Sequence, residues 1–151
     1  MALLYCAAPR CDAVSDVLCV AQPRRTHFYS AVKRAVELLK GPDHESECKW
    51  IVALTDGADT CDAELRERDK EAAMAGLRDT DDLNLAVITL GEEVNRPEHL
   101  TGIEHLVASA TKGGREPDAG IRVGANDLQQ VEEAFRKIAE QMVAPSGGAM
   151  G

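Results

Sequence analysis

Residues 50–57, WIVALTDG, decide the fold. The apolar run Trp50 to Leu54 lacks the polar alternation of a strand that has one face in water. It is typical of a strand covered on both faces, as in a parallel sheet between helices. Thr55-Asp56-Gly57 ends the run, because Asp and Gly favour turns. This stretch therefore predicts one central strand of an α/β domain.

Helices and further strands are expected on either side of this run. Upstream, apolar residues at helical spacing predict a helix from His27 to Lys40, ended by Gly41-Pro42. Downstream, a charged stretch from Ala63 to Arg78 predicts a second helix, and residues 83–90 (LNLAVITL) predict another buried strand. The expected core positions of these two helices are Phe28, Val32, Ala35, Val36 and Leu39 in the first, and Leu65, Ala72, Ala73, Ala75 and Leu77 in the second.

The C-terminal part continues the alternation of helix and strand. We expect a helix from Leu100 to Thr111, a short edge strand at Ile121 to Val123 and a last helix that begins after Asn126 or Asp127. The apolar stripe of the last helix is Leu128, Val131, Phe135, Ile138 and Met142. Strands alternating with helices predict an α/β fold with a doubly wound, mostly parallel sheet and helices on both faces.

One domain accounts for the length of 151 residues. Residues 25–143 carry the strand and helix pattern. Residues 1–24 are expected to be irregular, with one short strand at Val17 to Ala21, and residues 144–151 are expected to form a disordered tail.

Composition excludes several classes of function. The formal net charge of −9 disfavours nucleic acid as a partner, and no run approaches the ~18 apolar residues of a membrane-spanning helix.

The five cysteines are odd in number and lack C-x-x-C spacing, which favours free thiols, a reducing compartment and a cytoplasmic, soluble protein. The apolar start is a weak signal peptide, so secretion stays an alternative. Nucleotide-binding and nucleophile-elbow motifs are absent from the sequence, so we expect no enzyme and no catalytic residue.

The ordered set of motifs resembles the von Willebrand factor A (vWA) family. The Thr-Asp-Gly turn after residues 50–54 is similar to the end of a vWA strand, and residues 25–32 (RTHFYSAV) are similar to the loop and helix start that precede it. Residues 85–91, 106–114 and 127–142 resemble later family elements in the same order. The resemblance covers about residues 25–142 and implies a vWA or Rossmann-like sheet.

The resemblance also implies a metal-ion-dependent adhesion site. Its second-loop threonine matches Thr26 and its third-loop aspartate matches Asp56. The D-x-S-x-S segment of the family has no match, because residues 12–16 (DAVSD) have the wrong spacing and lie too close to Thr26. The chain therefore looks like a vWA domain truncated at its start. With one neutral oxygen and one carboxylate left, we expect Mg²⁺ or Mn²⁺ to bind weakly or not at all.

Simpler structural roles compete with these assignments. Thr26 at a helix start is typical of an N-cap, and Asp56 before a glycine is typical of a turn. The acidic residues Asp59, Asp62 and Glu64 are expected to form a solvated loop rather than a calcium site. His99 and His105, six positions apart in a helix, are not expected to share a face. Cys48 and Cys61 flank the central strand and are expected to be free thiols.

The resemblance implies a protein-protein interaction module with a degenerate or incomplete adhesion site, whose partner would contribute an acidic side chain at the metal. The alternative is a Rossmann-like hydrolase or phosphotransferase that uses Asp56 as a nucleophile. If the family's first strand is missing, residues 2–8 or 17–21 should take its place beside Trp50 to Leu54. Otherwise that strand would be left as an apolar edge.

Overall fold

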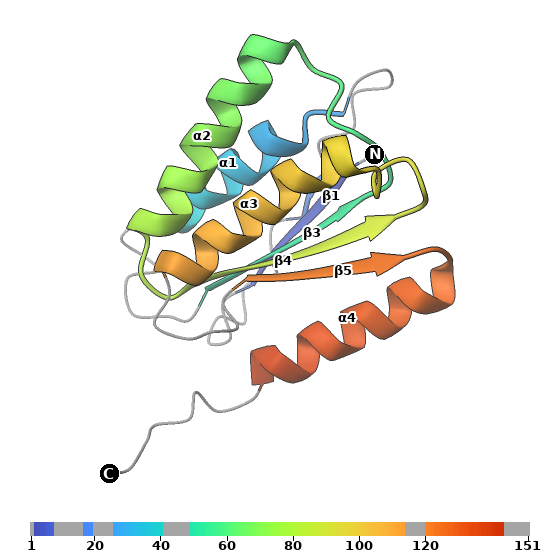
Figure 1. Cartoon of the computed structure of the whole chain (residues 1–151). Coiled ribbons are helices and arrows are strands. Elements are labelled where there is room, and N and C mark those ends of the chain that lie inside the picture. The colour runs from blue at the N-terminus through green and yellow to red at the C-terminus, as the bar shows by residue number, and fades with distance from the viewer. Residues whose placement is uncertain (1, 8–16, 20–25, 41–48, 114–119, 144–151) are drawn as a thin grey trace.

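A five-stranded sheet forms the centre of the molecule in the computed structural model, which describes residues 2–7, 17–19, 26–40, 49–113 and 120–143. The strand order is β2-β1-β3-β4-β5 (Figure 1). β3, β4 and β5 are parallel to one another, whereas β1 is antiparallel to both of its neighbours. The strands are β1 (Ala2–Ala7), β2 (Val17–Cys19), β3 (Lys49–Thr55), β4 (Leu83–Leu90) and β5 (Gly120–Ala125).

β1 lies beside β3, in the position where the family's first strand was expected to be missing. It pairs along the full length of β3, from Ala2 opposite Thr55 to Ala7 opposite Trp50. The expectation that early residues would lie beside Trp50 to Leu54 is therefore confirmed. The segment before residue 25 differs from prediction in containing two strands instead of one, because β2 pairs in turn with β1.

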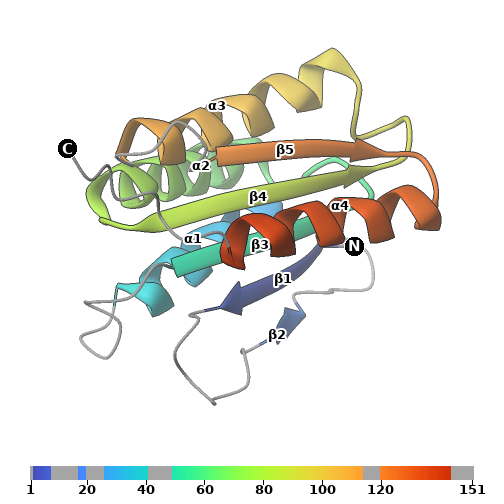
Figure 2. The ribbon, with the colours of Figure 1, turned by 90° about the horizontal axis from the view of Figure 1, so that it is seen from below.

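Four helices cover the sheet, three on one face and one on the other (Figure 2). The prediction of an α/β fold with helices on both faces is confirmed. Each predicted helix is present with ends shifted by at most three residues. The helices are α1 (Phe28–Leu39), α2 (Ala63–Asp79) and α3 (Pro97–Gly113) on one face, and α4 (Leu128–Val143) on the other.

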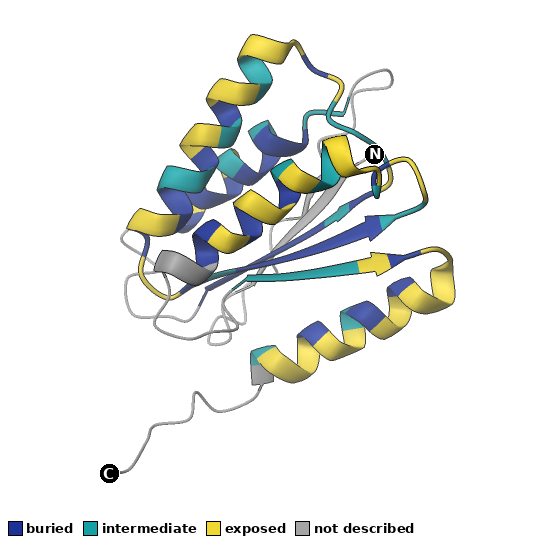
Figure 3. Cartoon of the chain, in the orientation of Figure 1, coloured by how far each residue is buried: buried dark blue, intermediate teal, exposed yellow. Residues whose placement is uncertain are grey.

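Successive residues of β3 and β4 point to opposite faces, so each strand contributes to two cores. Ile51 and Leu85 pack among the helices α1, α2 and α3, whereas Trp50 and Ile88 pack against α4. All four side chains are buried, which explains the lack of polar alternation in these strands (Figure 3). Gly91, with φ of 90°, ends β4 in the left-handed region that favours glycine.

The buried positions of α2, which packs against α1, differ from the predicted core positions. Ala72 is exposed, and the carboxylate of Asp69 is buried in its place. Asp69 accepts hydrogen bonds from Ser30 Oγ and from Lys33 Nζ, the latter at 3.1 Å, both on α1. Gly76 allows a close approach of the helices, since a Cβ atom there would lie 2.6 Å from Val36 Cγ1.

One predicted core residue of α4 is exposed instead. Leu128 was expected in the apolar stripe of α4, but it lies at the first position of the helix and is 81% exposed. Helices long and apolar enough to cross a membrane do not occur in the described part of the chain. The expected tail, residues 144–151, and Cys48 lie outside the described residues.

Candidate functional site

A pocket of about 370 Å³ lies at the carboxyl end of β3, between the helices α1, α2 and α3. Phe28 and Tyr29 from the start of α1 line it together with Thr55 and the loop after β3. The first two turns of α2 form one wall, and the N-terminal half of α3, residues 98–105, forms another. Ligands of parallel α/β sheets bind at this end of the strands.

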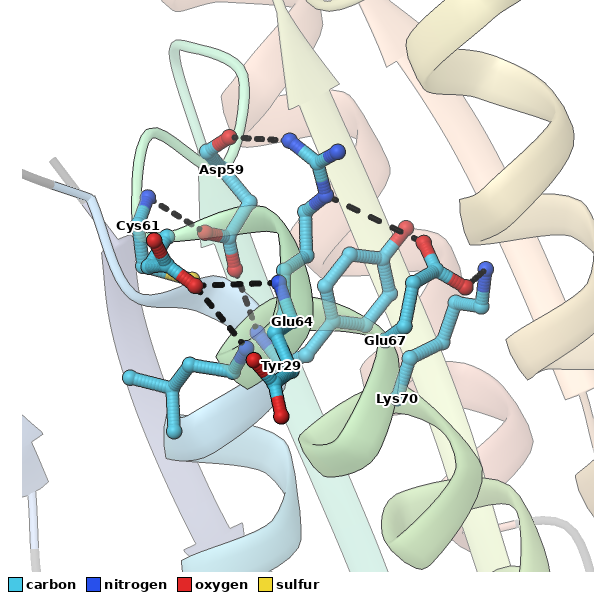
Figure 4. A network of polar contacts seen from close by, with 9 residues as sticks. Tyr29, Asp59, Cys61, Glu64, Glu67 and Lys70 are labelled. Atoms are coloured by element: carbon cyan, nitrogen blue, oxygen red, sulfur yellow. Dashed lines mark hydrogen bonds and ion pairs between the residues drawn. The ribbon is translucent and has the colours of Figure 1, made fainter.

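The loop after β3 is attached to α1 by the side chain of Asp59. Its Oδ2 accepts the backbone N–H of Tyr29 at 3.1 Å, and its Oδ1 accepts that of Cys61 at 3.0 Å (Figure 4). The N-terminal N–H groups of a helix have no partner within the helix, so Asp59 satisfies one of them from outside.

Asp59, Asp62 and Glu64 were predicted to form a solvated acidic loop, and Asp62 and Glu64 are exposed, but two of the three also accept hydrogen bonds from the backbone. Asp59 bonds to α1 and its own loop, as described above. Asp62 caps α2, accepting the backbone N–H of Glu64 at 3.0 Å and that of Leu65 at 3.5 Å. Both carboxylates therefore accept hydrogen bonds from backbone N–H groups that would otherwise lack a partner within the chain.

The N-cap position of α1 is not Thr26, which was the simpler of its two predicted roles, but the next residue. His27 is the N-cap residue and makes no side-chain capping bond. Thr26 is joined instead to the loop after β3. Its N–H donates to Thr60 Oγ1 at 2.8 Å, and the N–H of Thr60 donates to the Thr26 carbonyl at 2.9 Å. The segment before α1 and the loop after Asp56 therefore lie side by side.

Asp56 follows the last residue of β3 and is exposed. Neither Asp56 nor Thr26 lines the pocket, although Thr55 and Gly57, on either side of Asp56, do. A magnesium ion takes about six oxygen ligands. The described residues include no group of three or more acidic, His or Cys side chains that could hold a metal ion. Thr26 and Asp56 together do not fit a firmly held ion.

Charged side chains from α2 enter the pocket already paired with one another. Glu67 Oε2 lies 2.5 Å from Lys70 Nζ, and Glu67 Oε1 lies 3.9 Å from Arg66 Nε. Arg66 also donates to the carbonyl of Asp59 at 3.5 Å (Figure 4). These contacts occupy both cations, Arg66 and Lys70, and one of the carboxylates that line the pocket, that of Glu67.

Two buried groups beside the pocket have raised pKa values. Burial raises the pKa of the Tyr29 hydroxyl from 10.0 to about 12, and the negative charges of Asp59 and Glu67 add to the rise. Burial also raises the pKa of the Cys61 thiol from 9.0 to about 12, together with its hydrogen bond to Asp59. Cys61 is a free thiol, as predicted. Both groups are neutral near pH 7.

The two histidines of α3 were predicted not to share a face of the helix, and the lining of the pocket does not contradict this prediction. His99 and His105 both line the pocket, although they are six positions apart. The pocket follows the helix for about two turns, so it touches more than one side of α3. Helical periodicity describes the faces of an isolated helix. It carries no information about the pocket that α3 borders in the folded chain.

Comparison of the chain with protein-family models, with curated proteins and with solved structures found no significant match in any of the three. The functional assignment therefore depends on the arrangement of the site.

Sequence reasoning missed Tyr29 as a site residue. It lies in a helix start with apolar spacing, which is the usual signature of a core residue. The only signal in the sequence was that a phenol at such a position carries a hydroxyl that needs a partner when buried. That need becomes visible only when the surroundings of the ring are known.

Proposed function

We propose that this chain is a protein-protein interaction module of the vWA type, with an incomplete metal-ion-dependent adhesion site at Thr26 and Asp56. The observation that carries the proposal is the reciprocal pair of hydrogen bonds between Thr26 and Thr60, at 2.8 and 2.9 Å. It draws the segment of Thr26 to the loop that begins at Asp56, as the adhesion-site resemblance requires of its second and third loops.

The sheet supports the same proposal at a coarser level. In a vWA domain the strand that carries the D-x-S-x-S segment lies beside the strand equivalent to β3. Here β1 lies in that position and runs antiparallel to β3. An antiparallel replacement supplies hydrogen-bond partners to β3, but it cannot direct a D-x-S-x-S loop to the carboxyl end of the sheet. β1 itself, with the sequence ALLYCA, also carries no D-x-S-x-S segment, which supports the proposal that the metal site is incomplete.

An interaction role also agrees with the chemistry of the rim. Asp56 is exposed, and the two cationic side chains that line the adjoining pocket, Arg66 and Lys70, are paired with Glu67. A phosphotransferase that used Asp56 as a nucleophile would need cations directed at the transferred group. The described contacts favour binding over that chemistry.

Selection of peptides from a displayed library on the immobilised chain tests the proposal. Selected peptides should bind Asp56→Ala and Thr26→Val variants at least ~5-fold more weakly than the unchanged chain. Glu132→Gln, an exposed change on α4 across the sheet, is the matched control and should leave binding unchanged. Selection of no peptide, or of peptides that bind all four proteins equally, would contradict an interaction surface at this rim.

A further inference from the structure

The hydroxyl of Tyr29 is a buried polar group without a hydrogen bond among the described residues. Tyr29 is only 6% exposed, and its described contacts are the backbone bond to Asp59 and an edge-to-face contact with Phe28. An unpartnered buried hydroxyl loses its bonds to water without replacement, which costs free energy. Because Tyr29 lines the pocket, a molecule bound there can supply the missing partner.

The position of this hydroxyl is fixed by α3. A Cβ atom at Gly102 would collide with Tyr29 Oη, so the hydroxyl lies directly against the backbone of α3 at that residue. Glu98 precedes Gly102 by four positions and lines the same pocket. Residues four apart lie on one face of a helix, with Cβ atoms about 5–6 Å apart. Tyr29 and Glu98 therefore belong to the same wall of the pocket.

Glu98 is the second group at this wall that can accept a new partner. Its only ionic contact among the described residues is with His99, 3.9 Å between Oε1 and Nε2, and that contact is an ion pair only when the histidine is protonated. The other charged groups are engaged: Asp59 accepts two backbone N–H groups, and Glu67 is paired with Lys70 and Arg66.

The charge of the pocket favours a cation. Three carboxylates line it (Asp59, Glu67 and Glu98) against two permanently charged cations (Arg66 and Lys70), in a chain of formal net charge −9. Tyr29 Oη and the Glu98 carboxylate both accept hydrogen bonds, and a group rich in N–H donors satisfies both at once. An anion would meet Glu98 in repulsion and would compete with Glu67 for Arg66 and Lys70.

We propose that this pocket receives a guanidinium or ammonium group from an arginine or lysine side chain of a protein partner, which donates to Tyr29 Oη and Glu98. The assignment of the cation to a protein partner rests on the interaction function proposed above. The binding position of the cation rests only on the residues that line the pocket. The basic side chain anchors the partner beside the rim of Thr26 and Asp56, where we expect a metal ion to bind only weakly.

The test is a titration of the isotope-labelled chain, followed through the amide signals of Tyr29 and Gly102. The probe is arginine blocked at both ends, as the N-acetyl N-methylamide. We expect saturable shifts with a Kd of ~1 mM, typical of a single small anchor. Blocked glutamate and inorganic phosphate should leave both signals in place. Absence of saturation with blocked arginine, or saturation with phosphate, would overturn the proposal.

Three variants separate binding from folding. Tyr29→Phe and Glu98→Gln should each weaken binding ~5-fold, whereas Glu132→Gln should have no effect. Tyr29→Phe removes a hydroxyl without a partner and should leave thermal stability near pH 7 unchanged or higher. A destabilised Tyr29→Phe variant, or one that binds blocked arginine as well as the unchanged chain does, would contradict the assigned role of the hydroxyl.

Free arginine distinguishes the source of the cation. A partner's side chain carries no free α-carboxylate, so blocked arginine should bind at least as tightly as free arginine. Tighter binding of free arginine would overturn the assignment to a protein partner and indicate a site for an amino acid. If blocked arginine binds but peptide selection yields no binder, the proposed interaction function fails while the cation site stands.

Discussion

The carboxylate of Asp59 accepts the backbone N–H of Tyr29 across 30 positions of sequence, with 3.1 Å between Oδ2 and N. A capping residue normally lies at the start of its own helix. Here the loop after β3 supplies the residue that accepts a hydrogen bond from the first turn of α1. The cap consequently joins the loop after the central strand to the helix start that lines the pocket.

Replacing Asp59 with alanine should lower the free energy of unfolding by about 2 kcal/mol, because the N–H groups of Tyr29 and Cys61 both lose their acceptor. Urea denaturation measures the change. Asp81→Ala, in an exposed loop at the opposite end of β4, is the control and should change stability by less than about 0.5 kcal/mol. Equal effects of the two substitutions would show that the Asp59 bonds contribute nothing.

Asp69 should stabilise the chain at neutral pH and lose this effect in acid. Burial alone would raise its pKa, but hydrogen bonds from Ser30 and Lys33 and the charges of Lys33 and Arg68 hold it below 3.8. A depressed pKa stabilises the fold above the unfolded value and loses that contribution as the pH falls through the folded one. Asp69→Asn should cost about 1–3 kcal/mol at pH 7.

Acid titration of the Asp69→Asn variant checks the sign. The difference in unfolding free energy between the two proteins should shrink as the pH falls below 3.8. Glu71→Gln, an exposed change on the same helix, should track the unchanged chain at every pH. A difference that grows in acid would mean that the Asp69 pKa is raised in the folded chain.

Alkaline pH should destabilise the fold through Tyr29 and Cys61. Folding raises the pKa values of both groups, from 10.0 and 9.0 respectively to about 12. Their contribution is fully present below the unfolded pKa and is lost as the pH rises towards the folded one. Stability should therefore fall between pH 9 and about 12.

Removing either titrating group should flatten this fall. Tyr29→Phe and Cys61→Ala should each show a smaller loss of unfolding free energy between pH 9 and about 12 than the unchanged chain. Urea midpoints measured across the window provide the comparison. Parallel curves for all three proteins would assign the alkaline transition to other groups, such as the lysines.

Deleting residues 1–22 should expose β3. The deletion removes β1, whose pairing extends from Ala2 opposite Thr55 to Ala7 opposite Trp50. Ile51 to Leu54 should lose protection from hydrogen exchange, and the apolar edge should promote aggregation. Deletion of residues 144–151 is the control and should leave this protection unchanged. Strong protection of Ile51 to Leu54 in a monomer that lacks residues 1–22 would contradict the role given to β1.

Calorimetric titration with Mg²⁺ or Mn²⁺ should give binding no tighter than about 1 mM, since Thr26 and Asp56 supply two of the roughly six ligands that such an ion takes. Asp56→Ala should abolish whatever binding is measured. A micromolar constant that disappears in Asp56→Ala would show that further ligands assemble around this aspartate.

Much of the sheet and its covering helices could be predicted because their signals are local. β4 has the predicted bounds, and Asp127 caps α4 as expected, accepting the N–H of Gln130 at 2.8 Å. The direction of β1 could not be predicted, since the apolar residues 2–7 are compatible with parallel and antiparallel pairing. Only the partner strand selects between the two.

The candidate site was predicted less completely than the fold. Thr26 and Asp56 were predicted from a motif and stay a prediction, while the structure brings their segments together through Thr60. The burial of Asp69 and the unpartnered hydroxyl of Tyr29 depend on contacts between α1, α2 and α3, which are far apart in the sequence. Helical periodicity assigns charged residues to solvent, so it placed Ala72 in the core and gave no core position to Asp69.

The close approach of α1 to α2 has an evolutionary consequence. Val36 and Gly76 share one volume, because a Cβ atom at position 76 would lie 2.6 Å from Val36 Cγ1 but 3.6 Å from Val36 Cβ. Alanine at position 76 is therefore excluded beside valine but is accommodated once position 36 is also alanine. Natural variation at these two positions is expected to be correlated, and each residue sets the mutations that the other can accept.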